Sequence, residues 1–173
     1  MKYLLVALAF PALYLGAKFG FPELLPVVAV PSPGTSTPFE PLDFFEGETS
    51  SVGTLSTVLG KERALSVRSL GQRRPDGALV ITQTISLEGE PERTRTWVLE
   101  ADGENSFSGS LSDATGDVTA IKGGRRMVIG YDTEDGTIRQ TLTQIGEGEV
   151  LNRLDVYKWG LNIARLDATI TRG

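Results

Sequence analysis

Alternation of apolar and polar residues limits the folds open to this chain more than any other property. From about residue 50 onward, short segments repeat with a period of two, and in one of them a single face carries Leu79, Ile81, Ile85 and Leu87. A period of two places apolar side chains on one face of a β-strand, whereas a helix has a period of about 3.6. No long segment after residue 50 shows the helical period. The folded part is therefore predicted to be all-β.

Turn signals separate these segments about every eight to twelve residues. The strongest are the pairs Asp76-Gly77, Asp102-Gly103 and Asp135-Gly136, because Asp and Gly both accept the positive φ of a tight hairpin. Consecutive hairpins predict an antiparallel meander of about eight to ten strands. A sheet of this size has two unpaired edges unless it closes, so we expect the meander to close into a β-barrel.

The N-terminal part of the chain has a different composition. Residues 1–18 contain Lys2 followed by an apolar run, which is typical of a signal peptide and shorter than the roughly 20 residues of a membrane span. We expect a signal peptide or a short membrane anchor here. Residues 19–41 are rich in Pro, Ser and Thr, which predicts an extended linker. The barrel domain is expected over residues 42–173, exported to the periplasm or held at a cell-envelope membrane.

The chain contains no histidine and no cysteine. This excludes Ser-His-Asp and Cys-His catalysis, disulfides, and the imidazole and thiolate ligands of most transition-metal sites. Carboxylates gather around Glu90 and around Glu134, but in expected turns, without the facing pair of a glycosidase or the spacing of a calcium loop. We therefore expect a protein that is not an enzyme and that holds neither a metal nor a cofactor.

The charge distribution argues against a nucleic-acid partner. The formal net charge is -5, and the longest basic runs are the pairs Arg73-Arg74 and Arg125-Arg126. Each pair lies beside Pro or Gly in a predicted turn, where solvated surface charge is the expected role. Proteins that bind nucleic acids usually gather Lys and Arg on one face.

Four residues are candidates for a small-molecule site inside the barrel. Trp97, Phe107 and Tyr131 are large aromatic residues in predicted strands, where such side chains either line a ligand cavity or fill the core. Arg153 lies on a half-apolar strand face, which indicates either a partnered structural arginine or a residue that orients a carboxylate or phosphate. Trp159 raises the same two alternatives, a ligand contact or a place in the core.

A segment before the first predicted strand is expected to plug one end of the barrel. Residues 42–46, Leu-Asp-Phe-Phe-Glu, are amphipathic and precede Gly47, which is suited to ending a short turn or helix. Packing of the two phenylalanines into the core is the expected role.

These segments also carry a family resemblance over about residues 40–172. Its most specific part is Asn152-Arg153 with Lys158-Trp159-Gly160-Leu161, and further parts are 42–47, 94–97, Gly109, Asp113 and Gly116. The chain resembles a bacterial family of predicted lipoproteins that is known as a domain of unknown function. The resemblance implies a lipocalin-like barrel and no catalytic residues. Lipoproteins carry a lipidated cysteine after the signal, and this chain has none.

Two functions are compatible with these observations. The first is a module that binds a small apolar or amphipathic ligand in the barrel, with a membrane contacted through the N-terminal segment. The alternative is a structural or protein-interaction module of the cell envelope, with a filled core and an unspecified protein partner. A cavity would favour the first, and a solid interior would favour the second.

Overall fold

The computed structural model describes residues 38–173 of the chain. The predicted leader, residues 1–18, and most of the predicted linker, residues 19–41, lie outside the described residues. Within the described part, one short helix precedes ten strands: α1 (Pro41–Phe44), β1 (Gly47–Thr57), β2 (Arg63–Arg73), β3 (Leu79–Leu87), β4 (Arg93–Ala101), β5 (Ser106–Leu111), β6 (Val118–Gly123), β7 (Arg126–Thr133), β8 (Gly136–Gln144), β9 (Glu149–Lys158) and β10 (Leu161–Arg172).

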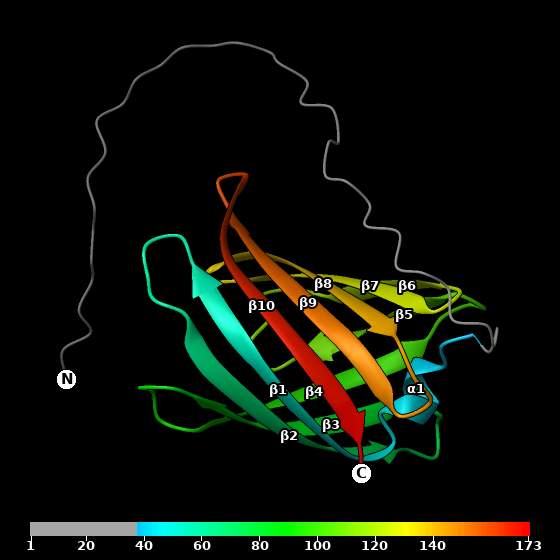
Figure 1. Ribbon diagram of the computed structural model, residues 1–173. Coiled ribbons are helices and arrows are strands. Elements are labelled where there is room, and N and C mark those ends of the chain that lie inside the picture. The colour runs from blue at the N-terminus through cyan, green and yellow to red at the C-terminus, as the bar shows by residue number, and fades with distance from the viewer. Residues whose placement is uncertain (1–37) are drawn as a thin grey trace. The chain divides into compact units, whose positions relative to one another are not determined.

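The ten strands form a closed antiparallel barrel (Figure 1). Each strand pairs with the next along the chain, and β1 pairs with β10 from Thr49↔Arg172 to Thr57↔Ala164. The closure joins the first and last strands, so neither is left as an open edge. The all-β closed meander predicted from the alternation is confirmed.

The barrel has a closed end, where α1 lies. Phe39 and Phe44 are buried there, and the rings of Phe39, Phe44 and Phe45 pack edge to face with centroids 4.9 to 6.5 Å apart. The predicted plug is thus confirmed. Phe39, within the predicted linker, is already part of the core, and its backbone N–H donates to the carbonyl of Gly124 at 2.9 Å.

Most of the fully buried core lies next to α1. Phe39, Leu79, Met127, Leu142 and Val150 are fully buried there, whereas the fully buried Val118 begins β6 nearer the opposite end. The opposite end, formed by the β1–β2, β3–β4, β5–β6, β7–β8 and β9–β10 loops, is referred to as the open end. Among residues 38–173, no helix is long and apolar enough to cross a membrane.

Candidate functional site

A cavity of about 700 Å³ runs along the inside of the barrel, from Phe45 behind the plug to the open end, where Glu134 and Asp135 line it. Strands β1 to β4 and β7 to β10 line it, together with the β5–β6 and β7–β8 loops. Small residues on β1 and β10, such as Ser51 and Ala164, leave space that larger side chains would fill. Much of the wall is apolar, including Leu65, Val67, Ile81, Ile85, Ile129, Ile138, Leu154 and Val156.

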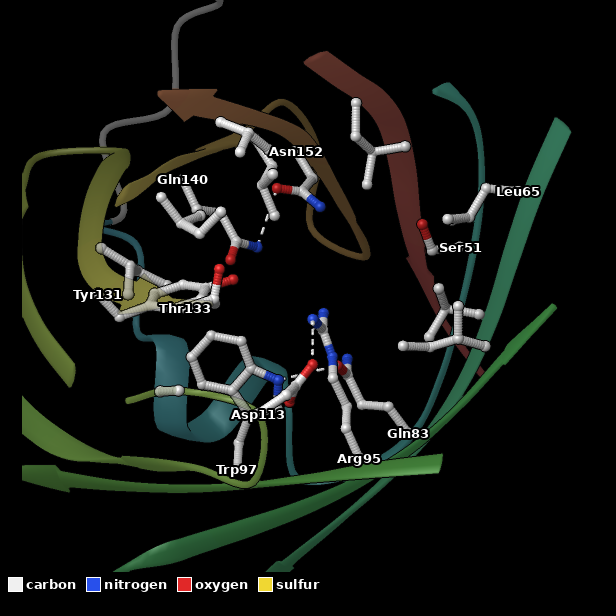
Figure 2. A pocket seen from close by; sticks show the side chains of 18 of the residues that line it. Ser51, Leu65, Gln83, Arg95, Trp97, Asp113, Tyr131, Thr133, Gln140 and Asn152 are labelled. Atoms are coloured by element: carbon white, nitrogen blue, oxygen red, sulfur yellow. Dashed lines mark hydrogen bonds and ion pairs between the residues drawn. The ribbon is translucent and has the colours of Figure 1, made fainter. Parts of the chain in front are cut away.

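A polar cluster on β3 and β4 projects into this cavity (Figure 2). The Gln83 Oε1 atom accepts hydrogen bonds from Arg95 Nε at 2.7 Å and from Trp97 Nε1 at 2.8 Å. The Gln83 amide in turn donates to Ser69 Oγ at 3.2 Å. Because both donors to Gln83 are N–H groups, the amide orientation is determined. Gln83 therefore holds Arg95 and Trp97 in a fixed arrangement.

The guanidinium of Arg95 is the charged centre of the cavity. Its side chain is 17% exposed, and its central carbon lies 5.4 Å from the centroid of the Trp97 ring. The Asp113 carboxylate, on the β5–β6 loop, lies 4.0 Å from Arg95 Nη1. This distance is longer than a direct hydrogen bond, so Asp113 offsets the charge without occupying the terminal N–H groups. A cavity with such a group is suited to an anionic or hydrogen-bond-accepting ligand.

Tyr131, on β7, completes the aromatic side of this cluster. Its ring packs edge to face on Trp97, with centroids 5.4 Å apart and an interplanar angle of 88°. Burial raises the pKa of the Tyr131 hydroxyl above its ordinary value, and Asp113 adds to this effect while Arg95 opposes it. Tyr131 therefore stays a neutral phenol, which can both donate and accept a hydrogen bond in the cavity.

A second polar pair lies on β8 and β9. Gln140 Nε2 donates to Asn152 Oδ1 at 3.0 Å, and both side chains line the cavity (Figure 2). Gln140 is 7% exposed, and its Oε1 atom has no hydrogen-bond partner among the described residues. A buried acceptor without a partner is uncommon, because its desolvation is not compensated. The cavity thus offers an unused acceptor to a ligand hydroxyl or N–H group.

Three of the four predicted site residues are buried in the barrel, but only two line the cavity. Trp97 and Tyr131 are each 6% exposed and form part of its wall. Phe107, on β5, is 5% exposed and belongs to the hydrophobic core instead. For Phe107, filling the core, the alternative considered from the sequence, is the role that the structure shows.

Arg153 is on the outside of the barrel, so its predicted position in the interior is wrong. Its side chain is 58% exposed, and its Nε atom donates to Asp167 Oδ1 at 2.8 Å. The neighbouring Asn152 faces the cavity. Successive residues of a strand point to opposite faces, so an error of one residue exchanges an inner for an outer side chain. Trp159 is also outside, in the β9–β10 turn, and is 88% exposed.

The interior polar residues were missed as site candidates, although some left a signal in the sequence. Arg95 lies two residues before Trp97, so both belong to one strand face, and a charged residue there indicates a functional or partnered group. Gln83 shares a face with Ile81 and Ile85 in the same way. Asp113 lies in a loop, and no periodicity identified it.

The acidic residues of the described part do not form a metal site. Within residues 38–173, no group of three or more carboxylates is placed to hold a metal ion. Glu134 and Asp135 lie at the mouth of the cavity, which Arg93 and Lys158 also line. The mouth therefore carries both signs of charge.

Solved structures with the same fold have very different sequences. One is an S-type phycobiliprotein lyase, CPES, from Guillardia theta, with a TM-score of 0.60 and 9% identity over 76% of this chain and 90% of that chain. Another is a protein of unknown function from the DUF3598 family of Nostoc punctiforme, with a TM-score of 0.56 and 14% identity over 83% of this chain and 53% of that chain. At such low identity, both similarities show the fold alone.

Family comparison agrees with the resemblance seen in the sequence. No curated protein sequence matches the chain significantly. Residues 32–172 match the family model described as a protein of unknown function, DUF3833. This range includes all ten strands and the plug at the closed end. The chain therefore belongs to the DUF3833 family.

Proposed function

We propose that this protein is a binding protein, not an enzyme, that holds one small amphipathic molecule in the barrel. The acidic head group of the ligand contacts Arg95, and its apolar part lies against the aliphatic wall. The observation that carries the proposal is the guanidinium of Arg95, oriented by Gln83 inside a largely apolar cavity of about 700 Å³. A volume of this order is typical of small-molecule sites.

The unpartnered Oε1 atom of Gln140 adds a second requirement for the ligand. A hydroxyl or N–H group on the ligand would satisfy this acceptor and remove the cost of its burial. A molecule with an acidic group and a second polar group on an apolar body therefore fits the cavity better than a plain hydrocarbon. The apolar residues 1–18 support an exported location at the cell envelope as part of the same proposal.

The cavity argues against the alternative of a structural module with a filled core. A filled barrel would leave no cavity of about 700 Å³ between its strands. Small or polar residues such as Ser51 and Gln140 face the cavity instead. Packing alone gives no reason for a buried charge there.

Binding of a dansyl-labelled fatty acid to the full-length protein tests this function by fluorescence titration. We expect Arg95→Met to weaken binding by about 10- to 100-fold, the usual contribution of a hydrogen bond to a charged group. Arg153→Met, which removes an arginine from the outer surface, is the matched control and should bind as the wild type does. The uncharged methyl ester of the same probe should bind both variants equally.

Two results would contradict the function. The first is an unchanged affinity of Arg95→Met, provided that its far-UV circular dichroism shows a folded barrel. The second is an equal loss in Arg95→Met and Arg153→Met, which would place the probe outside the cavity. Arg95→Lys provides a further check, because it keeps the charge but loses the hydrogen bond from Nε to Gln83.

A further inference from the structure

Two hairpin tips at the open end expose large apolar side chains. Val58 and Leu59, in the β1–β2 turn, are 70% and 88% exposed, and Trp159 and Leu161, at the β9–β10 turn, are 88% and 67% exposed. We call these four residues the rim patch. Contiguous exposed apolar side chains on a folded domain commonly mark a surface that meets a partner or a membrane.

The two tips lie side by side because the first and last strands are paired. The β1–β10 ladder runs up to Thr57↔Ala164, and beyond it the Val58 N–H donates to the carbonyl of Ile163 at 3.2 Å. Both hairpins extend from the barrel at the end opposite α1 (Figure 1). The two halves of the rim patch therefore lie on neighbouring hairpins, although about 100 residues of sequence separate them.

The conformation of Trp159 is unfavourable for a bulky residue. Its φ is +52° and that of Gly160 is +78°, which together make a two-residue hairpin turn. Asn, Asp or Gly is usual at such a position, and a left-handed conformation costs other residues about 1–2 kcal/mol. The ring is nevertheless in solvent, with Lys158 Nζ 5.6 Å from its centroid. Strain that supports no buried contact is typical of a functional position.

The residue types of the rim patch indicate what it contacts. Lys61 and Lys158 flank the apolar tips, and neither forms an ion pair within the part of the chain that the structure describes. Trp side chains favour the head-group level of a bilayer, and lysines there reach the phosphates while their stems stay in apolar surroundings. We propose that the rim patch docks the open end of the barrel onto the surface of a lipid bilayer.

A bilayer fits the rim patch better than a protein partner does. A stable protein interface engages about 20–30 residues on each side, whereas the rim patch offers four apolar side chains on two protruding turns. Protruding turns of this kind are suited to entering a soft surface. Lys61 is followed by Glu62, and the turn that carries Glu134 and Asp135 adjoins Lys158, so the apolar side chains and not net charge carry the docking.

The docked orientation would place the cavity mouth at the bilayer. Leu55, Ile163 and Ala164 line the cavity next to the tips, and Lys158 lines it beside Trp159. An apolar wall thus continues from the rim patch into the barrel. A ligand with a long apolar part could pass from the membrane to the cavity along this wall with little exposure to water.

Fluorescence of Trp159 in the full-length protein tests the docking directly. The probe is vesicles of phosphatidylcholine, some of which carries bromine near the start of its acyl chains. We expect the emission to shift to shorter wavelength and the bromine to quench it. Trp159→Phe retains only the emission of the buried Trp97, so the difference between the two proteins reports Trp159 alone.

A pair of exposed substitutions shows whether binding depends on the rim patch. We expect Leu59→Ser to weaken partitioning into the vesicles about tenfold, since it removes most of one leucine's transfer energy. Ile121→Ser, at a residue 68% exposed on β6, is the matched control and should leave partitioning unchanged. Raised salt should leave binding of the wild type almost unchanged, because apolar side chains carry it.

Three outcomes would overturn the docking. One is vesicle binding without quenching of Trp159, which would place attachment in another part of the chain, such as residues 1–18. Another is an equal loss of binding in Leu59→Ser and Ile121→Ser. The last is a Trp159 environment that changes only when a second protein is added. None of these outcomes bears on ligand binding in the cavity, which the dansyl titration measures separately.

Discussion

The two ends of the barrel are built from opposite distributions of side chains. At the closed end, the inside is filled by phenylalanines and the outside is held by ion pairs, with Lys122 Nζ 2.6 Å from Glu40 and Arg73 Nη2 2.7 Å from Asp43. At the open end, polar groups such as Arg95 lie inside and apolar groups such as Trp159 lie outside. Stability and recognition are thus divided along the axis of one continuous sheet.

The division has a physical cause in the residues that face inward. Phenylalanines and large aliphatic residues pack around α1 and close that end of the barrel. Small residues along the interior of β1 and β10, such as Ser51 and Ala164, leave the space of the cavity. A barrel can tolerate this loss of burial because its backbone hydrogen bonds form a closed ring along its whole circumference.

The largest expected difference between the two ends is in the free energy of unfolding that is lost when one large side chain is truncated. Phe44→Ala, at the closed end, should lower the free energy of unfolding by about 3–5 kcal/mol, because it leaves a cavity among buried aromatic rings. Leu59→Ala, at the exposed β1–β2 turn, should change it by less than about 0.5 kcal/mol. Urea denaturation followed by circular dichroism measures both. Equal losses would show that the two ends are not energetically distinct.

A pair of glycine substitutions tests the same contrast at the backbone. A Cβ atom at Gly71 would overlap the carbonyl oxygen of Phe45, so Gly71→Ala should push the plug away and cost about 1–3 kcal/mol. Gly116, in the β5–β6 loop of the open end, has open space where a Cβ atom would point, and Gly116→Ala should be nearly neutral. Thermal denaturation of the pair measures the difference. A neutral Gly71→Ala would show that the plug is loosely held.

The buried hydroxyl of Tyr131 predicts that the stability of the fold depends on pH in the alkaline range. The folded-state pKa of Tyr131 lies above the ordinary value of 10.0, so its contribution to stability is full below that pH and is lost as pH rises through the folded-state pKa. Stability of the wild type should therefore fall more steeply in alkali than that of Tyr131→Phe. Urea midpoints measured across the alkaline range check this, and identical slopes would rule it out.

Substitutions on the outer surface of the barrel should change the folding stability least. Arg153→Ala removes the ion pair with Asp167, and both side chains are more than half exposed. Exposed pairs contribute about 0–1 kcal/mol, since solvent screens them and ordering long side chains is unfavourable. A double-mutant cycle with Asp167→Ala measures the coupling. A coupling well above that range would show that the outer face supports the fold more than burial indicates.

The sequence predicted the barrel because the information that specifies it is local. Alternation marks each strand, and a turn such as Asp76-Gly77 reverses it, with Gly77 at φ +92°. The cavity depends instead on which side chains meet across the interior, as Arg95 and Asp113 do from separate elements. No period along the chain encodes such a meeting. Arg153 shows the related limit, since a shift of one residue decides whether a side chain binds or is solvated.

Closure of the barrel also affects the order in which the chain folds. Nine of the strand pairings join neighbours in sequence, whereas the tenth, between β1 and β10, must bring together segments more than 100 residues apart. Bringing such distant segments together costs chain entropy that the hairpins do not, so this seam is expected to form last. Ile170→Val, within the seam, should then accelerate unfolding in stopped-flow experiments and leave the folding rate almost unchanged. Before that step the chain would be an open, curved sheet of hairpins, and the closed cavity would form only when β1 pairs with β10.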